Sequence, residues 1–337
     1  MGEPAGLRVY ATCPQSKDVE PAEYRTRVAD VARWSEEAGC HGILVYTDNG
    51  IADPWLVAQE VIEATTRLRP LVAVQSVYMS PYSVAKMVTT LAYLHGRAVD
   101  LNIVAGGFRN DLLALGDDTP HDERYNRAVE YTKIITGLLN GETVSFEGDW
   151  YTVKNLRLTP PLPRDLAPGL TISGSSPAGL AAAEEIGALA VRYPKPVSEE
   201  QREGIPTPTS GVGVRVGVIA RESAAAAWRI ARERFPEDRH GEVKHQLAMK
   251  VSDSHWHRDL SQREQGVEEA DNPYWLGPFN NGQTFCPYLV GTHERVGDEL
   301  ARYAGAGFAT FILDIPPDRE ELEHTGAAFE QARARIA

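Results

Sequence analysis

The sequence predicts an α/β fold, a (β/α)8 barrel of the TIM type, from three observations. Short runs rich in β-branched residues alternate with longer amphipathic stretches along the chain. The short runs number eight, and repeated strand–helix units are typical of parallel strands joined by crossover helices. A doubly wound sheet is the alternative, but the Gly-x-Gly-x-x-Gly turn expected after its first strand is absent, and the chain there reads ATCPQSKD.

The eight predicted strands are short and bounded by turn-forming or polar residues. In chain order they are LRVYAT at 7–12, HGILVYT at 41–47, RPLVAVQS at 69–76, VDLNIVAG at 99–106, GLTISG at 169–174, ALAVRY at 188–193, VGVRVGVIA at 212–220 and FATFILD at 308–314.

Seven amphipathic stretches between these strands predict helices. Several begin with Pro or with a capping Ser, Thr or Asp and end at Gly, as helix termini do. The stretches span 21–39, 54–67, 81–96, 121–141, 176–187, 222–235 and 292–307.

Two segments interrupt the strand–helix repeat. The first, about 140–168, alternates like a β-hairpin and then becomes rich in proline, which predicts an insertion before the fifth strand. The second, about 234–290, predicts an insertion before the eighth strand, and its part at 250–290 is a candidate lid. Because both are insertions in one repeat, a single domain over 1–337 is expected.

Composition limits the possible partners. The 337 residues are 42% hydrophobic and carry a formal net charge of −13, which favours a folded protein and disfavours a nucleic-acid or anionic-membrane surface. No apolar run approaches the roughly 20 residues that cross a bilayer, and no export signal is recognised at the start. A small-molecule partner is therefore expected.

Cysteine and histidine usage argues against a metal or a disulfide framework. Three cysteines without C-x-x-C spacing favour a reducing, cytoplasmic location. His255 and His257, with Asp259 nearby, stand two positions apart and would not face one another on a helix. No metal is expected.

Two glycine-containing turns follow predicted strands and indicate a binding site. The strand ending NIVAGG carries Asn102 and a bare backbone to the C-terminal end of the barrel, where a flat ligand can approach closely. The turn with Gly174, Ser175 and Ser176 precedes a helix, so it is either a simple helix cap or an anion site. Gln75, which ends the third strand, either hydrogen-bonds the ligand or lines the barrel.

An ordered set of segments covers most of the chain and carries a resemblance. The set is RPLVAVQSVYMSPYSVAKMVTTLAYLHGRAVDLNIVAGG, HDERYNRAVEYTKII, GETVSFEGDWYTVKN, ISGSSPAGLAAAEEIG and VGVRVGVIARESAAAAWRIA. It resembles the bacterial luciferase-like superfamily of flavin-dependent oxidoreductases, and most of all its alkanesulfonate monooxygenase branch.

The resemblance implies a two-component monooxygenase. Such an enzyme receives reduced FMN (FMNH2) from a separate NAD(P)H flavin reductase, activates O2 as a peroxyflavin and oxygenates a small organic substrate. A homodimer or homotetramer is also implied. Two alternatives remain open, a deazaflavin (F420)-dependent oxidoreductase of the same superfamily and a non-catalytic flavin-binding subunit.

The resemblance also implies roles for particular residues. FMN would lie along Asn102, Val104 and Ala105, with its phosphate near Tyr125 and the Gly174 turn. The full expected cofactor-binding set is Thr47, Gln75, Asn102, Val104, Ala105, Tyr125, Gly174, Ser175 and Ser176. The expected catalytic residues are Arg215, Tyr193 and Asp314.

The chain departs from the sulfonate-binding pattern of that branch. Gly217 stands where the branch has a histidine, and Pro316 stands about where it has a tyrosine. A sulfonate needs fixed cationic donors, so a plain alkanesulfonate is not the expected substrate. Arg215 could instead hold a carboxylate, a phosphate or the charge of the peroxyflavin, and Asp314 could accept from an amine or hydroxyl, or the two could form a structural ion pair.

Overall fold

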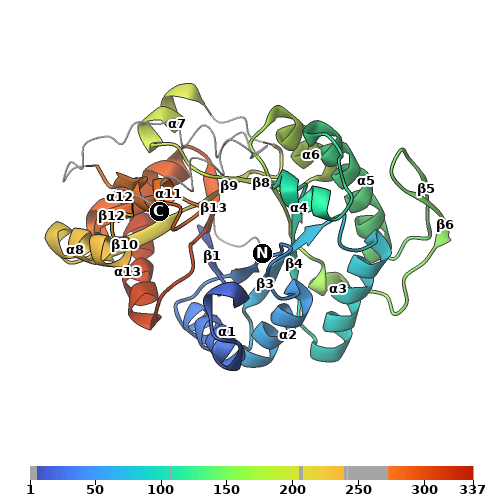
Figure 1. The fold of residues 1–337 in the computed structure, drawn as a ribbon, viewed down its shortest axis with the longest axis horizontal. Coiled ribbons are helices and arrows are strands. Elements are labelled where there is room, and N and C mark those ends of the chain that lie inside the picture. Colours follow the sequence, from blue (N-terminus) through green and yellow to red (C-terminus); the bar gives the residue numbers. More distant parts are fainter. Residues whose placement is uncertain (1–5, 107, 205–207, 239–240, 242–271, 337) are drawn as a thin grey trace.

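Eight parallel strands close into a barrel in a computed structural model that describes residues 6–106, 108–204, 208–238, 241 and 272–336 (Figure 1). Around the barrel the strand order is β1-β13-β9-β8-β7-β4-β3-β2. All eight predicted strands contribute, so the predicted (β/α)8 barrel is confirmed. Their bounds are β1 (Arg8–Thr12), β2 (Gly42–Val45), β3 (Arg69–Gln75), β4 (Asp100–Val104), β7 (Leu170–Ser173), β8 (Leu189–Arg192), β9 (Val212–Arg215) and β13 (Phe308–Ile312).

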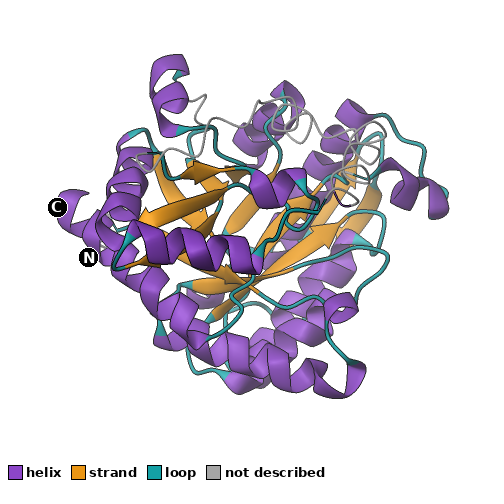
Figure 2. Ribbon diagram, turned by 60° about the vertical axis from the view of Figure 1, so that its left-hand side comes forward, coloured by secondary structure: helices purple, strands orange, loops and turns teal. Residues whose placement is uncertain are grey.

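Helices surround the strands (Figure 2). Capping residues fix where several of them begin, because a side-chain oxygen accepts from a backbone N–H of the first turn, as Asp53, Ser80, Ser176, Ser223 and Thr292 do. The longer helices are α1 (Pro21–Glu37), α2 (Pro54–Ala64), α3 (Pro81–His95), α5 (His121–Leu139), α6 (Pro177–Ile186), α8 (Ala224–Arg234), α12 (His293–Gly305) and α13 (Arg319–Ile336). The shorter ones are α4 (Arg109–Ala114), α7 (Val197–Glu203), α11 (Gly277–Asn280) and the 3-10 turns η1 (Ser16–Asp18) and η2 (Arg164–Leu166).

No helix in the described ranges is both long enough and apolar enough to pass through a membrane.

The predicted seventh strand is two strands, so the expectation of one continuous strand over 212–220 is wrong. β9 ends at Arg215, and β10 (Gly217–Arg221) leaves the barrel to join a second sheet with β12 (Tyr288–Thr292) and β11 (Tyr274–Trp275). The hydrogen bonding changes partner between consecutive residues. The Val216 amide donates to Ile312 O in the barrel, whereas the Gly217 amide donates to Pro287 O beside the second sheet.

The first insertion contains the predicted hairpin. Strands β5 (Val144–Glu147) and β6 (Thr152–Leu156) pair antiparallel and project from the barrel (Figure 1). The second insertion contains α8's last residue, β11 and α11, but 242–271 lies outside the described residues. His255 and His257 therefore lie outside the described residues, and so does part of the candidate lid at 250–290.

The N-terminal end of the barrel contains a buried carboxylate, Asp100, with several hydrogen-bond donors. Its side chain accepts from Tyr10 Oη at 3.0 Å, Arg69 Nη1 at 3.1 Å and the Gly169 amide at 2.8 Å. Burial alone would raise the pKa of Asp100, but His41, Arg69 and the Gly169 amide together hold it below its ordinary value. The Asp100 side chain therefore links β4 to β1 and β3 at this end of the barrel.

Candidate active site

A cavity lies at the C-terminal ends of the barrel strands, the end at which (β/α)8 enzymes carry their sites. Its empty volume, including the part open to solvent, is about 1110 Å³. Strand register builds one wall, because Gln75, Val104 and Ser173 are neighbours across β3, β4 and β7. The exposed rings of Phe108 and Phe285 contribute to the lining from the connecting segments.

Most of the residues expected in the site line this cavity. The nine are Thr47, Gln75, Val104, Ala105, Tyr125, Ser175, Ser176, Tyr193 and Arg215. The other three, Asn102, Gly174 and Asp314, are not among its lining residues, and each contacts a residue that is.

Asn102 is a buried amide inside the barrel. Its side-chain oxygen accepts from Thr171 Oγ1 at 2.8 Å and from Ser173 Oγ at 3.2 Å. The side chain of Asn102 is therefore engaged by its neighbours, and it orients Ser173, which reaches the cavity. The expected contact between Asn102 and a cofactor stays a prediction, and the structure adds this contact with Ser173 to it.

Gly174 makes room for Tyr125. A Cβ on Gly174 would lie 2.3 Å from Tyr125 Oη, and the residue has φ +154°. Tyr125 Oη donates to Ser173 O at 3.2 Å. Burial raises the pKa of Tyr125, although a hydrogen bond with Ser176 and the charge of Arg124 oppose this, so the phenol remains protonated at neutral pH. Tyr125 thus presents a neutral hydroxyl at the cavity wall.

The two serines of the turn have different roles. Ser176 is the N-cap of α6, where its hydroxyl accepts from the Gly179 amide at 3.1 Å. Ser175 lines the cavity beside it. The cap interpretation is confirmed for Ser176, and the anion site stays a prediction for the first turn of α6, whose free amides lie at the N-terminus of the helix.

Arg215 brings a charge into the opposite wall. The residue is 8% exposed, and its guanidinium carbon lies 4.6 Å from the ring centre of Tyr46 and 6.0 Å from that of Tyr193. Its carboxylate partner is Asp314, with 3.5 Å between Nη2 and Oδ1, which is an ion pair at the outer limit of hydrogen-bond distance. Arg215 Nε and Tyr46 Oη are both buried without a hydrogen-bond partner among the described residues. Unpartnered buried polar atoms cost free energy, and because Arg215 and Tyr46 both line the cavity, a ligand bound there would be the available partner.

Asp314 supports Arg215 from behind. Its carboxylate accepts from Tyr288 Oη at 2.9 Å and from the Ile315 amide at 2.9 Å. Burial and the nearby Asp314 charge raise the pKa of Tyr288 far above its ordinary value, so this phenol acts as a permanent donor. The Tyr288–Asp314–Arg215 chain therefore connects the second sheet to the cavity.

The structure adds residues to the cavity wall that sequence analysis did not mark. Gln15, Tyr46 and Asp48 follow β1 and β2, so the rule that barrel sites form at strand ends could have found them. No sequence signal distinguishes Phe285. Others of this kind are Tyr78, Phe108, Asp111, His121 and Ser173, whereas Gly106 belongs to the NIVAGG turn that was expected in the site. Among them, Asp111 has a raised pKa because of burial and the nearby Asp48 charge.

Comparison with known proteins agrees with this architecture. Residues 8–310 match the family described as luciferase-like monooxygenase. The monooxygenase BtrO of Niallia circulans, named for 4-(gamma-L-glutamylamino)butanoyl on the BtrI acyl-carrier protein, is 33% identical over 308 residues and 90% of each chain.

Two solved structures share the fold. EDTA monooxygenase (EmoA) from Chelativorans sp. BNC1 has a TM-score of 0.72 and 14% identity, over 98% of this chain and 95% of the other. An F420-dependent secondary alcohol dehydrogenase has a TM-score of 0.67 and 17% identity, over 97% and 99%. The solved structures show the fold, and the family match over residues 8–310 with the 33% identity to BtrO shows the family: this chain belongs to the luciferase-like monooxygenases.

Proposed function

We propose that this protein is an FMNH2-dependent monooxygenase of the two-component type, supplied by a separate NAD(P)H flavin reductase. The observation that carries the proposal is the pairing of two unlike cavity walls. One offers bare backbone, an amide and hydroxyls, and the other holds the incompletely paired Arg215. The likeness to BtrO, itself named a monooxygenase, supports the proposed reaction.

The residues of the first wall fit a reduced flavin. Val104, Ala105 and Gly106 present a narrow backbone surface beside the Gln75 amide, which suits a flat ring with polar edges. Ser175 and the first turn of α6 suit a phosphate. Bound FMNH2 would supply the electrons that activate O2 for transfer of one oxygen atom.

The chain's own residues would bind, orient and shield. Arg215 would hold a negative charge close to the reacting groups, where burial strengthens its effect. Tyr46 and Tyr193 flank its guanidinium and limit how it can turn. Phe108 and Phe285 would cover the cavity with apolar surface and so reduce the access of water.

The substrate we propose is an acyl group tethered to a carrier protein rather than a plain alkanesulfonate. The name of BtrO supports the first half of this statement. The exclusion of a plain alkanesulfonate is supported at Gly217, where a Cβ would lie 2.3 Å from the Tyr288 ring. A histidine cannot occupy that position without displacing Tyr288, so a sulfonate-binding histidine has no place here.

The test begins with anaerobic titration of the protein with FMNH2 and, in parallel, with reduced F420. We expect saturable binding of FMNH2 and, after a flavin reductase and O2 are added, a product heavier by one oxygen atom from an acyl-carrier thioester. Preference for reduced F420 would favour the alternative cofactor. Binding of FMNH2 without oxygenation of carrier-bound or free acyl substrates would favour a non-catalytic subunit. Failure to bind either cofactor would overturn the proposal.

A further inference from the structure

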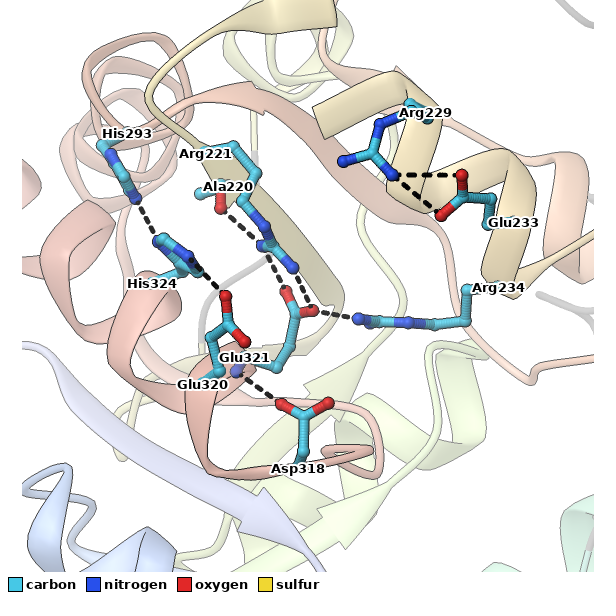
Figure 3. A network of polar contacts seen from close by, with 10 residues as sticks. All are labelled: Ala220, Arg221, Arg229, Glu233, Arg234, His293, Asp318, Glu320, Glu321 and His324. Atoms are coloured by element: carbon cyan, nitrogen blue, oxygen red, sulfur yellow. Dashed lines mark hydrogen bonds and ion pairs between the residues drawn. The ribbon is translucent and has the colours of Figure 1, made fainter. Parts of the chain in front are cut away.

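Three potential metal ligands meet outside the barrel, away from the cavity lining. They are Glu222, which directly follows β10, His293 in the first turn of α12, and His324 in α13. One ligand atom from each lies within 4.8 Å of the other two. Figure 3 shows His293 and His324 facing one another across the gap between their helices.

Strand pairing brings the first two ligands together. Arg221 and Thr292 are partners in the parallel register of β10 and β12. The next residue on each strand, Glu222 or His293, therefore leaves the sheet at the same edge. The third ligand, His324, comes from the helix that packs against β10. The cluster is thus fixed by the backbone of three separate elements.

The two imidazoles are arranged as a metal-binding pair would be. His293 Nε2 and His324 Nδ1 are 2.9 Å apart and share a hydrogen bond, which an ion between them would replace, and the ring planes differ by 23°. Two nitrogens bound tetrahedrally to one zinc ion at about 2.0–2.1 Å lie about 3.3–3.4 Å apart, a few tenths of an ångström farther than in this structure. Both rings are only partly exposed, which limits their freedom to separate.

A neighbouring carboxylate occupies the position of an outer-shell partner. Glu320 Oε1 is 3.7 Å from His324 Nε2, the ring nitrogen that does not face His293. Metal-bound histidines commonly give their second N–H to a carboxylate, which fixes the tautomer and orients the ring.

The surrounding charges permit a cation. Arg221 is the nearest positive residue, but Glu321 accepts from both of its terminal nitrogens at 3.1 and 2.9 Å and also pairs with Arg234 (Figure 3). The N-terminus of α12 adds partial positive charge. Glu222 and Glu320 offset it with two carboxylates beside the imidazoles.

We propose that Glu222, His293 and His324 form a structural site for one divalent transition-metal ion of the zinc class, with solvent completing the coordination. The ion would join the end of β10, the start of α12 and the second turn of α13. Its effect would be on stability, and it does not depend on flavin binding or on the proposed reaction.

The first experiment is calorimetric titration of the full-length, chelator-treated protein with Zn²⁺, repeated with Co²⁺ while visible absorbance is recorded. We expect one ion per chain and a Co²⁺ spectrum typical of nitrogen and oxygen ligands. His293→Gln and His324→Gln should each lower affinity by about a hundredfold, and Glu320→Gln by about tenfold or more. His95→Gln, which changes a histidine on α3 outside the cluster, is the matched control and should bind like the wild type.

Thermal unfolding separates binding from misfolding of the histidine variants. Glu222→Gln changes an exposed side chain, so this variant should fold normally while its unfolding temperature no longer rises with Zn²⁺, as that of the wild type does. Absence of stoichiometric binding in the wild type would overturn the proposal. So would binding that survives in all three ligand variants, because the ion would then sit on other residues.

Discussion

The two ends of the barrel use buried charge differently. At the N-terminal end, the Asp100 carboxylate has three hydrogen-bond donors within 3.1 Å. At the C-terminal end, Arg215 has one carboxylate contact at 3.5 Å and an Nε atom without a partner among the described residues. A complete network stabilises the fold, whereas an incomplete one leaves binding capacity for a ligand. The difference separates the end that holds the barrel together from the end that we expect to bind and react.

The strongest test of this comparison is Asp100→Ala. Removing the carboxylate leaves the Tyr10 hydroxyl, the Gly169 amide and Arg69 without their shared acceptor, so we expect a loss of about 3–5 kcal/mol in unfolding free energy. Urea unfolding measures it. Asp100→Asn keeps the shape and one acceptor and should cost less. A loss in Asp100→Ala no larger than that of an ordinary surface change would contradict the comparison.

The matching change at the other end is Arg215→Met. We expect kcat/KM to fall by about 10²–10³, because a buried charge aimed at the reacting groups is lost. The unfolding free energy should fall less than in Asp100→Ala, since Asp314 keeps its bonds from Tyr288 and the Ile315 amide. Steady-state rates and urea unfolding of the same preparation provide the check. Full activity with reduced stability would show that Arg215 is structural.

A third change tests whether the proposed flavin-binding side of the cavity requires glycine at position 174. Gly174→Ala places a Cβ 2.3 Å from Tyr125 Oη, so we expect a loss of about 2–3 kcal/mol in stability and weaker FMNH2 binding. Gly187→Ala is the control, because Gly187 also has positive φ but its nearest neighbour, Ser210 Oγ, is 3.9 Å from the added Cβ. Equal flavin affinity in both variants would show that the Gly174 turn does not contribute to the site.

The smallest effect is expected at Asp117, a carboxylate near the cavity end with several close donors, although Nε of its partner Arg127 is, like that of Arg215, buried without a hydrogen-bond partner among the described residues. Asp117 accepts from both terminal nitrogens of Arg127, at 2.6 and 3.2 Å, and from the Thr119 hydroxyl. Burial would raise the pKa of Asp117, but these bonds lower it to about 2.

Because the folded pKa of Asp117 lies below the unfolded one, its stabilising contribution is fully present above about pH 4 and is lost as the pH falls toward 2. We expect Asp117→Asn to cost on the order of 1 kcal/mol at pH 7 and to flatten this part of the curve of unfolding free energy against pH. If the unfolding free energy of Asp117→Asn falls with pH below about 4 as steeply as that of the wild type, Asp117 is no better paired than Arg215.

The sequence was sufficient for the barrel because the strand signal is local. All eight runs form barrel strands, and the residues at the ends of β3, β4 and β9 line the cavity as expected. The break at Val216 was not predictable, since it depends on which strand accepts each amide hydrogen bond. Helix α13 was not marked, although Leu322, Ala328 and Phe329 form its buried face.

Contacts between distant segments account for the rest. Phe285 reaches the cavity from a segment that no strand-end rule covers. Glu222, His293 and His324 come from three separate segments, so no ligand spacing exists for a motif to detect. The unpartnered Nε of Arg215 is likewise a property of its neighbours rather than of its position in the sequence.

The chain from Tyr288 through Asp314 to Arg215 has an evolutionary consequence. Tyr288 packs edge-on against Phe235, with 4.9 Å between ring centres, and Phe235 in turn lies 6.2 Å from Trp275. These aromatic side chains lie outside the cavity lining, yet their packing sets the position of the hydroxyl that supports Asp314. Substitutions among these aromatic residues are therefore expected to shift Arg215 without changing any residue that lines the cavity, which would give directed evolution a second route to altered substrate binding.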